Sequence, residues 1–242
     1  MTRLPPSPLL NDAVGAETLD RLAATPRFNR WMFDRIRRWV GRDVLEIGSG
    51  IGNLSEFLVD TADRVVLTDT APEYLERLRK RFQPRSHVQV RRLYLPTVDG
   101  DLVGRGFDTI VCLNVLEHVE DDLGSLRAMR TLLAPRGRLV LLVPALQTLY
   151  GTLDEALGHF RRYRPRELRE KFAAAGLVMG HLEYFNLAGI PGWWFTGRVL
   201  RRRLLPAGSL RWYDRLVPLF RFERLLPWRI GQSLIAIGEV PV

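Results

Sequence analysis

Four residues near the start of the chain have types and spacing that suit cofactor chemistry: the carboxylate Glu46, followed by Gly48, Gly50 and Gly52. An apolar run precedes them, and apolar side chains recur at helical spacing from Leu54, so the glycines form the turn between a strand and a helix. Glycines allow positive φ and close approach of a ligand to the backbone, and a helix N-terminus presents unpaired N–H groups. The pattern predicts a site for a nucleotide-like cofactor.

This turn departs from the dinucleotide fingerprint G-x-G-x-x-G, because Asn53 occupies the third glycine position. A carboxylate two residues before the glycines suits a ligand with an ammonium group better than a pyrophosphate. A second apolar run, from Arg64 to Thr68, ends at Asp69, whose carboxylate can accept hydrogen bonds from both hydroxyls of a ribose. An ammonium group, a ribose and no diphosphate together describe S-adenosylmethionine.

At these residues the chain resembles the class I S-adenosylmethionine-dependent methyltransferases. The resemblance rests on the glycine turn, on Asp69 and on the run from Phe107 to Val119, and it spans roughly residues 25–185 with a last strand near 233–239. It implies that the turn contacts the methionine part, Asp69 the ribose and Asn114 the methionine amino end. The cofactor-binding residues predicted in this way are Glu46, Gly48, Ser49, Gly50, Gly52, Asn53, Asp69, Thr70, Tyr94, Leu95, Asn114 and Val115.

Two positions in this region differ from related patterns. Family members often carry an acidic residue where Tyr94 stands, so we expect Tyr94 to bond to or pack on the adenine and the Leu95 backbone to contact it. His118 directly follows Glu117, and quinone-type O-methyltransferases have two glutamates and a histidine here, proposed to hold a divalent metal. Asn114 replaces one of those glutamates, and an amide is a poorer ligand for a hard cation, so we expect no metal.

A second polar block runs from Tyr150 to Tyr163, directly after a predicted strand, where it is expected to fold over an acceptor pocket. His159 is the predicted general base, with His118 and Tyr150 as further catalytic candidates. In the alternative interpretation His159 only bridges a loop, and Arg161 forms an ion pair with Asp154. A similar block occurs in bacterial methyltransferases, some of them fused to or encoded beside polyprenyl-phosphate glycosyltransferases. The predicted acceptor-binding residues are Asp154, Arg162, Tyr163, Tyr184, Trp193 and Trp194.

Strands and helices alternate along the chain, which predicts a parallel sheet covered by helices. The expected strands are 44–47, 64–68, a third that begins at 88, 107–113, 139–143, 177–185 and 233–237. Asp121 and Asp122 are expected to cap a helix that includes Leu133 and ends at Pro135 and Gly137. The resemblance places the last strand antiparallel beside the sixth. The predicted fold class is α/β: a Rossmann-like, seven-stranded, mostly parallel sheet with helices on both faces, plus a helical insertion before the last strand.

Four segments are predicted along the chain. Residues 1–40, with an amphipathic pattern from Arg27 to Val40, form a helical cap over the cofactor; residues 41–185 form the S-adenosylmethionine-binding core; residues 232–242 form its final strand. Segment 186–231 is too long for a simple connection and combines aromatic residues and leucines with arginines. Three interpretations of it stay open: a lid over an apolar substrate, a helix at a lipid interface, and plain packing on the sheet.

Composition and charge limit the classes of partner and the cellular location that we expect. The formal net charge of +9, with arginine clusters at 161–164 and 198–203, fits either an anionic surface partner or solvated helix faces. No apolar stretch is long enough to span a membrane, no signal peptide is seen at residues 1–10, and the single Cys112 cannot form an internal disulfide. We therefore expect a cytoplasmic protein, peripheral to the membrane if the insertion contacts lipid.

The predicted function is methyl transfer to an oxygen, or to a nitrogen, of a small or lipid-carried acceptor with an apolar part. One alternative is an RNA methyltransferase, because residues 45–54 also resemble the rRNA adenine dimethylases. Those enzymes follow the equivalent of Asn114 with a proline and an aromatic residue, which this chain lacks, so a nucleic acid partner is disfavoured. The other alternative is a non-catalytic cofactor-binding module at a membrane surface. The sequence indicates no oligomeric state.

Overall fold

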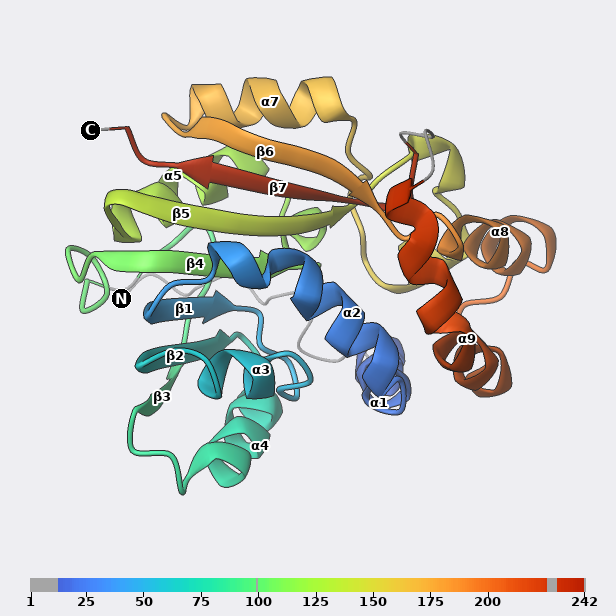
Figure 1. Ribbon diagram of the computed structural model, residues 1–242, viewed down its shortest axis with the longest axis horizontal. Helices are drawn as coiled ribbons and strands as arrows, with labels where there is room; N and C mark the ends of the chain where they lie inside the picture. Colours follow the sequence, from blue (N-terminus) through green and yellow to red (C-terminus); the bar gives the residue numbers. More distant parts are fainter. Residues whose placement is uncertain (1–12, 99, 226–229, 242) are drawn as a thin grey trace.

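A seven-stranded sheet forms the centre of the protein (Figure 1). The computed structural model describes residues 13–98, 100–225 and 230–241, so residues 1–12 and 226–229 of the two predicted helical segments lie outside the described residues. The strand order is β3-β2-β1-β4-β5-β7-β6, and β7 runs antiparallel to both of its neighbours, as predicted. The strands are β1 (Asp43–Ile47), β2 (Arg64–Asp69), β3 (Val88–Arg92), β4 (Phe107–Leu113), β5 (Leu133–Pro144), β6 (Val178–Phe185) and β7 (Ser233–Glu239).

Helices connect the strands and extend both ends of the core. Three of them, α2, α4 and α7, begin with proline, whose missing N–H costs nothing at the first helical position. The α-helices are α1 (Ala13–Ala23), α2 (Pro26–Ile36), α3 (Ser55–Val59), α4 (Pro72–Phe82), α5 (Asp122–Leu132), α6 (Thr152–Ala156), α7 (Pro165–Ala174), α8 (Gly189–Trp194) and α9 (Ala207–Phe220). Shorter 3-10 turns are η2 (Arg37–Trp39), η3 (Leu116–His118), η4 (Gln147–Leu149) and η6 (Arg221–Leu225), and η5 (Phe195–Val199) is a π-helix.

The central strands are buried on both faces, because each face has its own helical layer. Neighbouring residues of β1 show this: Leu45 packs in the cluster that contains α5 and α7, and Val44 in the cluster that contains α2, α3 and α4. Such continuous apolar strands are typical of parallel sheets. Cys112, on β4, is fully buried in the first cluster, in keeping with its predicted place in an apolar strand.

The structure differs from the prediction at the start of β5 and at α1. The helix α5 ends at Leu132, and β5 already begins at Leu133, because Phe107 of β4 pairs with Leu133 before a register shift. Pairing with a neighbouring strand thus overrides the helical pattern at Leu133. The helix α1 was also missed: only the pattern from Arg27 onward was interpreted as helical, and that part is confirmed as α2 and η2.

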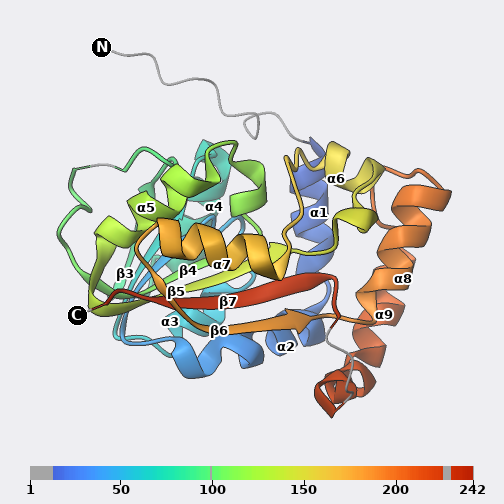
Figure 2. The ribbon, with the colours of Figure 1, turned by 90° about the horizontal axis from the view of Figure 1, so that it is seen from above.

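The order in which strands are added to the sheet switches sides at β1. The strands β2 and β3 lie on one side of β1, and β4 and the later strands lie on the other. In open α/β sheets, ligands bind at the carboxyl ends of the strands at such a point. Helices α1, α6, α8 and α9 all lie at that end of the sheet (Figures 1 and 2). The fold therefore brings the glycine turn, the polar block and the insertion to one edge.

Candidate active site

The glycine turn after β1 has the strained backbone that its sequence predicts. Gly48, Gly50 and Gly52 have φ values of +74°, +54° and +85°, a region that side chains disfavour. The N–H groups of Gly48 and Ser49 donate to the carbonyl oxygen of Thr68, at 2.9 and 2.8 Å, which ties the turn to the end of β2. A Cβ on Gly48 would lie 2.2 Å from a methyl group of Val115, so only glycine fits there.

Asp69, at the end of β2, is held by backbone donors. Its carboxylate accepts from the N–H groups of Gly50 at 2.8 Å, Thr70 at 2.7 Å and Ala71 at 3.1 Å. Burial raises its pKa above the ordinary value, although these three hydrogen bonds act in the opposite direction. A carboxylate has about four lone-pair sites, so acceptor capacity remains for a ligand's hydroxyl groups.

Two further cofactor candidates lie on either side of the turn. Glu46 is buried in β1 and accepts from the hydroxyl of Ser55, and burial raises its pKa. Its carboxylate therefore also holds the start of α3 in place. Asn114 follows β4 with a φ of +54°, which asparagine tolerates better than most residues, and its N–H donates to Leu142 at 2.8 Å. This backbone turn leaves its side chain exposed beside the glycine turn.

Tyr94, predicted to bind adenine, contacts the residue just after β2, and the predicted helical cap contacts the glycine turn. The hydroxyl of Tyr94 donates to the carbonyl of Thr70 at 3.4 Å, and Leu95 is half-buried behind it. From α1, the side chain of Leu19 lies against Gly50, while the amide of Asn53 donates to the Leu19 carbonyl at 3.1 Å. The helix α1 thus packs directly on the glycine turn. The cofactor role of these residues stays a prediction.

Three titratable side chains meet beyond the end of β4. Glu117, His118 and His159 each bring one ligand atom within 4.8 Å of the others, and the two imidazole rings are 4.6 Å apart. Glu117 is fully buried, and within the described part of the chain neither of its carboxylate oxygens has a hydrogen-bond partner. Burial raises the pKa of Glu117 to about 7, and burial, with a contribution from His159, lowers that of His118 to about 3. His118 is therefore neutral.

Asp154 is the anchor of the polar block. Its buried carboxylate accepts from Nδ1 of His159 at 3.0 Å, from Nε of Arg162 at 2.8 Å and from the indole N–H of Trp193 at 3.1 Å. Burial alone would raise the pKa of Asp154, but the His159 hydrogen bond and the Arg162 charge outweigh it and hold that pKa below its ordinary value. The hydroxyl of Tyr150 donates to the His159 carbonyl at 2.7 Å, which fixes the same loop.

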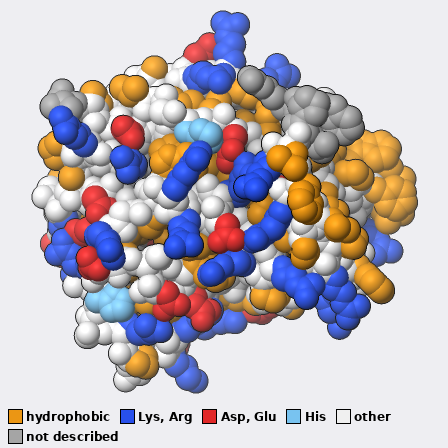
Figure 3. All heavy atoms as spheres, viewed as in Figure 1, with side chains coloured by type: hydrophobic (Ala, Val, Ile, Leu, Met, Phe, Trp, Pro, Cys, Tyr) orange, Lys and Arg blue, Asp and Glu red, His pale blue; other side chains and the backbone are white. Residues whose placement is uncertain are grey.

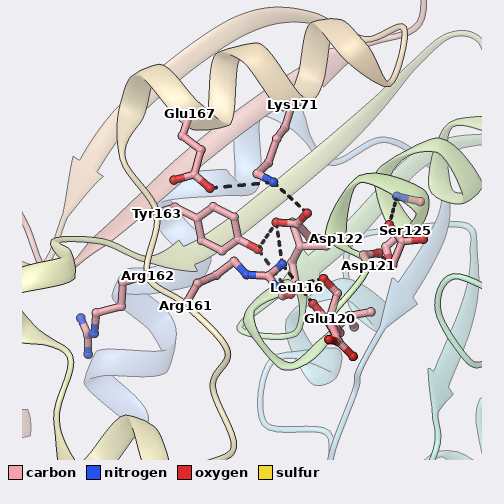
Figure 4. A network of polar contacts seen from close by, with 12 residues as sticks. Leu116, Glu120, Asp121, Asp122, Ser125, Arg161, Arg162, Tyr163, Glu167 and Lys171 are labelled. Atoms are coloured by element: carbon pink, nitrogen blue, oxygen red, sulfur yellow. Dashed lines mark hydrogen bonds and ion pairs between the residues drawn. The ribbon is translucent and has the colours of Figure 1, made fainter.

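A second network of hydrogen bonds and ion pairs holds this block against the start of α5 (Figure 4). Asp122 accepts from the Tyr163 hydroxyl at 3.0 Å, from Lys171 at 2.8 Å and from Arg161 at 2.9 Å. The ion pair of Asp154 is therefore made by Arg162, and the alternative interpretation that gave it to Arg161 was wrong. Only Asp121 acts as the N-cap, accepting from Gly124 at 2.8 Å.

The other predicted acceptor residues occupy different environments. Tyr163 is fully buried with its hydroxyl on Asp122, Tyr184 is half-buried on β6, and Trp194 is about half exposed. Of the two tryptophans, Trp193 is the one whose indole N–H donates to Asp154. Glu117 and Asp122 were not predicted as site residues. The sequence signal for Glu117 was its place beside His118, whereas nothing in the sequence distinguished Asp122 from a helix cap.

The set Glu117, His118 and His159 could hold a divalent cation. It combines two imidazole side chains with a carboxylate that has no hydrogen-bond partner among the described residues. A bound cation would supply Lewis-acid polarisation of an acceptor oxygen. Two nitrogens and one carboxylate are a poor set for Mg²⁺, which prefers oxygen ligands, and fit Zn²⁺ better. The expectation that no metal is used stays a prediction.

The pKa of Glu117 predicts how stability changes with pH. A folded-state pKa near 7, above the ordinary 4.5, means that burial of the charged form costs stability increasingly between pH 4.5 and 7 and fully above pH 7. We expect Glu117→Gln to stabilise the protein at pH 8, by on the order of 3 kcal/mol, and to change little at pH 4.5. Denaturant unfolding at both pH values measures this; an equal effect at both would contradict the assignment.

Comparisons with known proteins fit this geometry. A family model described as a methyltransferase domain matches residues 45–139, from β1 into β5. A ubiquinone biosynthesis O-methyltransferase of Azotobacter vinelandii is 29% identical over 167 residues, covering 63% of this chain and 71% of that protein. The same enzyme from Xanthomonas euvesicatoria pv. vesicatoria is 31% identical over 155 residues, covering 57% of this chain and 64% of that protein.

Solved structures share the whole fold. A crystal structure of an S-adenosylmethionine-dependent methyltransferase from Mesorhizobium loti matches with a TM-score of 0.61 at 15% identity, covering 86% of this chain and 97% of that chain. At this identity the likeness shows the fold alone. The family model contains the glycine turn, Asp69 and Asn114, which lie together at one edge of the sheet. Residues 45–139 therefore form a methyltransferase domain, and the chain around them has the fold of S-adenosylmethionine-dependent methyltransferases, with S-adenosyl-L-methionine as the methyl donor.

Proposed function

We propose that this chain transfers a methyl group to an oxygen of a small or lipid-carried acceptor that has an apolar part. Its relatives among the ubiquinone biosynthesis enzymes are O-methyltransferases, which supports oxygen as the acceptor atom and a small, partly apolar acceptor. A nitrogen acceptor or RNA is the weaker prediction, because a carboxylate, Glu117, stands where an adenine-binding site needs an aromatic face.

The observation that carries the proposal is the pair formed by Asp154 and His159. When Nδ1 of His159 donates to Asp154, the lone pair of Nε2 is free to accept the proton of a hydroxyl group. His159 lies beside Glu117 and His118, just past the end of β4, where Asn114 borders the cofactor turn. A base and the cofactor turn thus occur at one edge of the sheet.

In the proposed reaction the donor supplies a methyl group on a sulfonium, which loses its charge as the methyl leaves. Glu46, the glycine turn and Asn114 hold the methionine part, Asp69 the ribose, and Thr70, Tyr94 and Leu95 the adenine. Positioning of this kind can contribute about 7–11 kcal/mol to catalysis. As the acceptor oxygen forms its bond to the methyl carbon, His159 takes the hydroxyl proton on Nε2.

The remaining candidates assist in this proposal. Tyr150 fixes the loop that carries His159, and neutral His118 lines the same space. Trp193, Trp194 and Tyr184 offer apolar surface to the acceptor. Arg162 bonds to Asp154 and to the carbonyl of Ala145 at 2.9 Å, and Tyr163 bonds to Asp122, so both hold the polar block in place rather than bind a charged acceptor group.

An acceptor with an apolar part can partition into a membrane, so contact between the protein and the membrane surface would bring enzyme and acceptor together. On α9, Trp212, Leu216 and Leu219 recur at helical spacing and are exposed, with Trp212 at 65% and Leu219 at 64%. Exposed Arg211 and Arg215 flank them, and hydrophobic side chains gather over this region of the surface (Figure 3). Within the described part of the chain, no helix is long and apolar enough to cross a bilayer. We therefore propose peripheral contact through α9.

Vesicle flotation tests this contact. We expect the protein to float with anionic phosphatidylglycerol vesicles and the variant Trp212→Asp/Leu219→Asp to stay in solution, because apolar insertion and arginine attraction act together. Val178→Asp is the matched control, since Val178 is equally exposed, at 59%, but begins β6 away from the insertion. If wild type stays wholly in solution, or the double variant floats as well as wild type, the contact is excluded.

The reaction itself is tested with methyl-labelled S-adenosylmethionine. Incubation with lipid extract, polar metabolite extract or total RNA should transfer label to a lipid or a small hydroxyl compound, with mass spectrometry placing the methyl on oxygen. Label found only in RNA, or only on nitrogen, would contradict the proposal.

A further inference from the structure

The carboxylate of Asp154 joins the polar block to the insertion. Three of its donors come from its own block: His159 at 3.0 Å, Arg162 at 2.8 Å and the N–H of Gly151 at 3.1 Å. The fourth is the indole N–H of Trp193, in α8 of the insertion. The side chain of Asp154 is fully buried, so water does not replace a lost donor without rearrangement. Each of the four bonds therefore restricts the rotation of this carboxylate.

Trp193 is itself fixed on two sides. The guanidinium of Arg162 lies 4.9 Å from its ring centroid, a cation–π contact that does not need the indole N–H. The N–H bonds to Oδ2 of Asp154, while His159 bonds to Oδ1. The two oxygens of one carboxylate cannot move independently. The orientation of the His159 ring is thus linked to the position of α8.

The insertion is also bound firmly to the block around this contact. The hydroxyl of Thr152 lies within hydrogen-bond distance of the carbonyls of Gly197, at 2.9 Å, and Arg202, at 2.7 Å. Arg198 donates to the carbonyl of Tyr150 at 3.1 Å. A Cβ on Gly151 would lie 3.2 Å from the Gly197 carbonyl oxygen, so the two backbones are nearly in contact.

The other end of the insertion reaches the helices that cover the glycine turn. Asp214 of α9 accepts from the N–H of Phe28 at 2.8 Å, and Arg21 of α1 donates to the carbonyl of Leu205. The same α1 places Leu19 on Gly50. One segment therefore connects the cover of the cofactor turn with the neighbourhood of His159.

From these contacts we infer that Trp193 is a positioning residue, through which the insertion sets the orientation and tautomer of His159 by way of Asp154. This rests on the proposed function only where His159 is taken as the base. The physical link, from α8 to the imidazole ring, stands on the hydrogen bonds and can be measured without turnover. It explains why an indole, and not merely an apolar ring, faces the polar block.

The test is Trp193→Phe, which keeps a ring for Arg162 but removes the N–H. Two-dimensional NMR of ¹⁵N-labelled histidine reports the tautomer of His159. We expect wild type to show the Nδ1-protonated ring and the variant to shift toward the Nε2-protonated one, because Asp154 is less firmly held. We also expect kcat to fall about tenfold, with the S-adenosylmethionine Kd and the acceptor KM within twofold. Trp39→Phe, a half-buried tryptophan on η2, is the control and should change none of these.

The outcomes separate the two claims. An unchanged His159 ring spectrum in Trp193→Phe overturns the inference, whatever the activity does. A shifted ring with unchanged kcat supports the link between α8 and His159 but removes His159 as the base. A fall in kcat accompanied by an equal loss of cofactor affinity, with the ring unchanged, assigns Trp193 to packing only and also overturns the inference.

Discussion

Alanine at Asp69 is expected to weaken S-adenosylmethionine binding by at least 100-fold. In our proposal the carboxylate accepts both ribose hydroxyls, and hydrogen bonds to a charged group contribute about 1.5–3 kcal/mol each. Losing two therefore costs about 3 kcal/mol or more, which corresponds to roughly 150-fold in Kd. The backbone N–H of Gly50 also loses its acceptor, which adds to the effect. Isothermal titration calorimetry gives the Kd directly.

The control for this change is Asp63→Ala. Asp63 is an exposed carboxylate that pairs with Arg42 at 3.2 Å, just before β2, so its loss should leave Kd within twofold. Thermal unfolding of each variant separates lost binding from lost folding. If folded Asp69→Ala binds the donor as tightly as wild type, the ribose assignment fails.

Alanine at His159 is expected to lower kcat by about 10²–10⁴-fold, the range typical of a lost general base, with the donor Kd unchanged. Asp154 keeps three of its four donors, Arg162, Trp193 and Gly151, so the block should stay folded. Because a base must be deprotonated to act, kcat/KM of wild type should fall at low pH, and this acidic limb should disappear in the variant. Steady-state rates across pH measure both effects.

The matched control is His87→Ala, a half-buried histidine that contacts the carbonyl of Val59 at 3.0 Å and directly precedes β3, at the end of the strands opposite the candidate site. Full activity in His159→Ala would remove the base assignment. Loss of wild-type activity after chelator treatment, restored by Zn²⁺, would instead assign His159, with Glu117 and His118, to a metal site.

The fold could be predicted almost entirely from the sequence, because the spacing of apolar residues and the positions of proline and glycine indicate the same elements along most of the core. Pro72 and Pro165 open helices where predicted, and the apolar run from Phe107 to Leu113 is a buried central strand. The start of β5 could not be predicted, since Leu133 continues the spacing of the preceding helix. Its partner Phe107 lies 26 positions away, and such pairing leaves no local signal.

The candidate site was predicted less completely, for a related reason. The cofactor turn is local: Glu46, the glycines and the strand end at Asp69 each show their chemistry within a few residues. The buried contacts of the polar block are not local. Asp122 meets residues some 40 positions further along, and Asp154 meets Trp193 39 positions away. Arg162 rather than Arg161 pairs with Asp154, and Arg161 pairs with Asp122, because consecutive side chains leave an extended chain on opposite sides.

The central claim is that the glycine turn and Asp69 bind an adenosyl sulfonium compound. Calorimetric titration of the wild-type protein with S-adenosylmethionine, and then with its demethylated product, tests it most directly. Our account predicts saturable one-to-one binding of both, abolished or greatly weakened in Asp69→Ala and retained in His159→Ala. No detectable heat from either compound at millimolar concentration would contradict it.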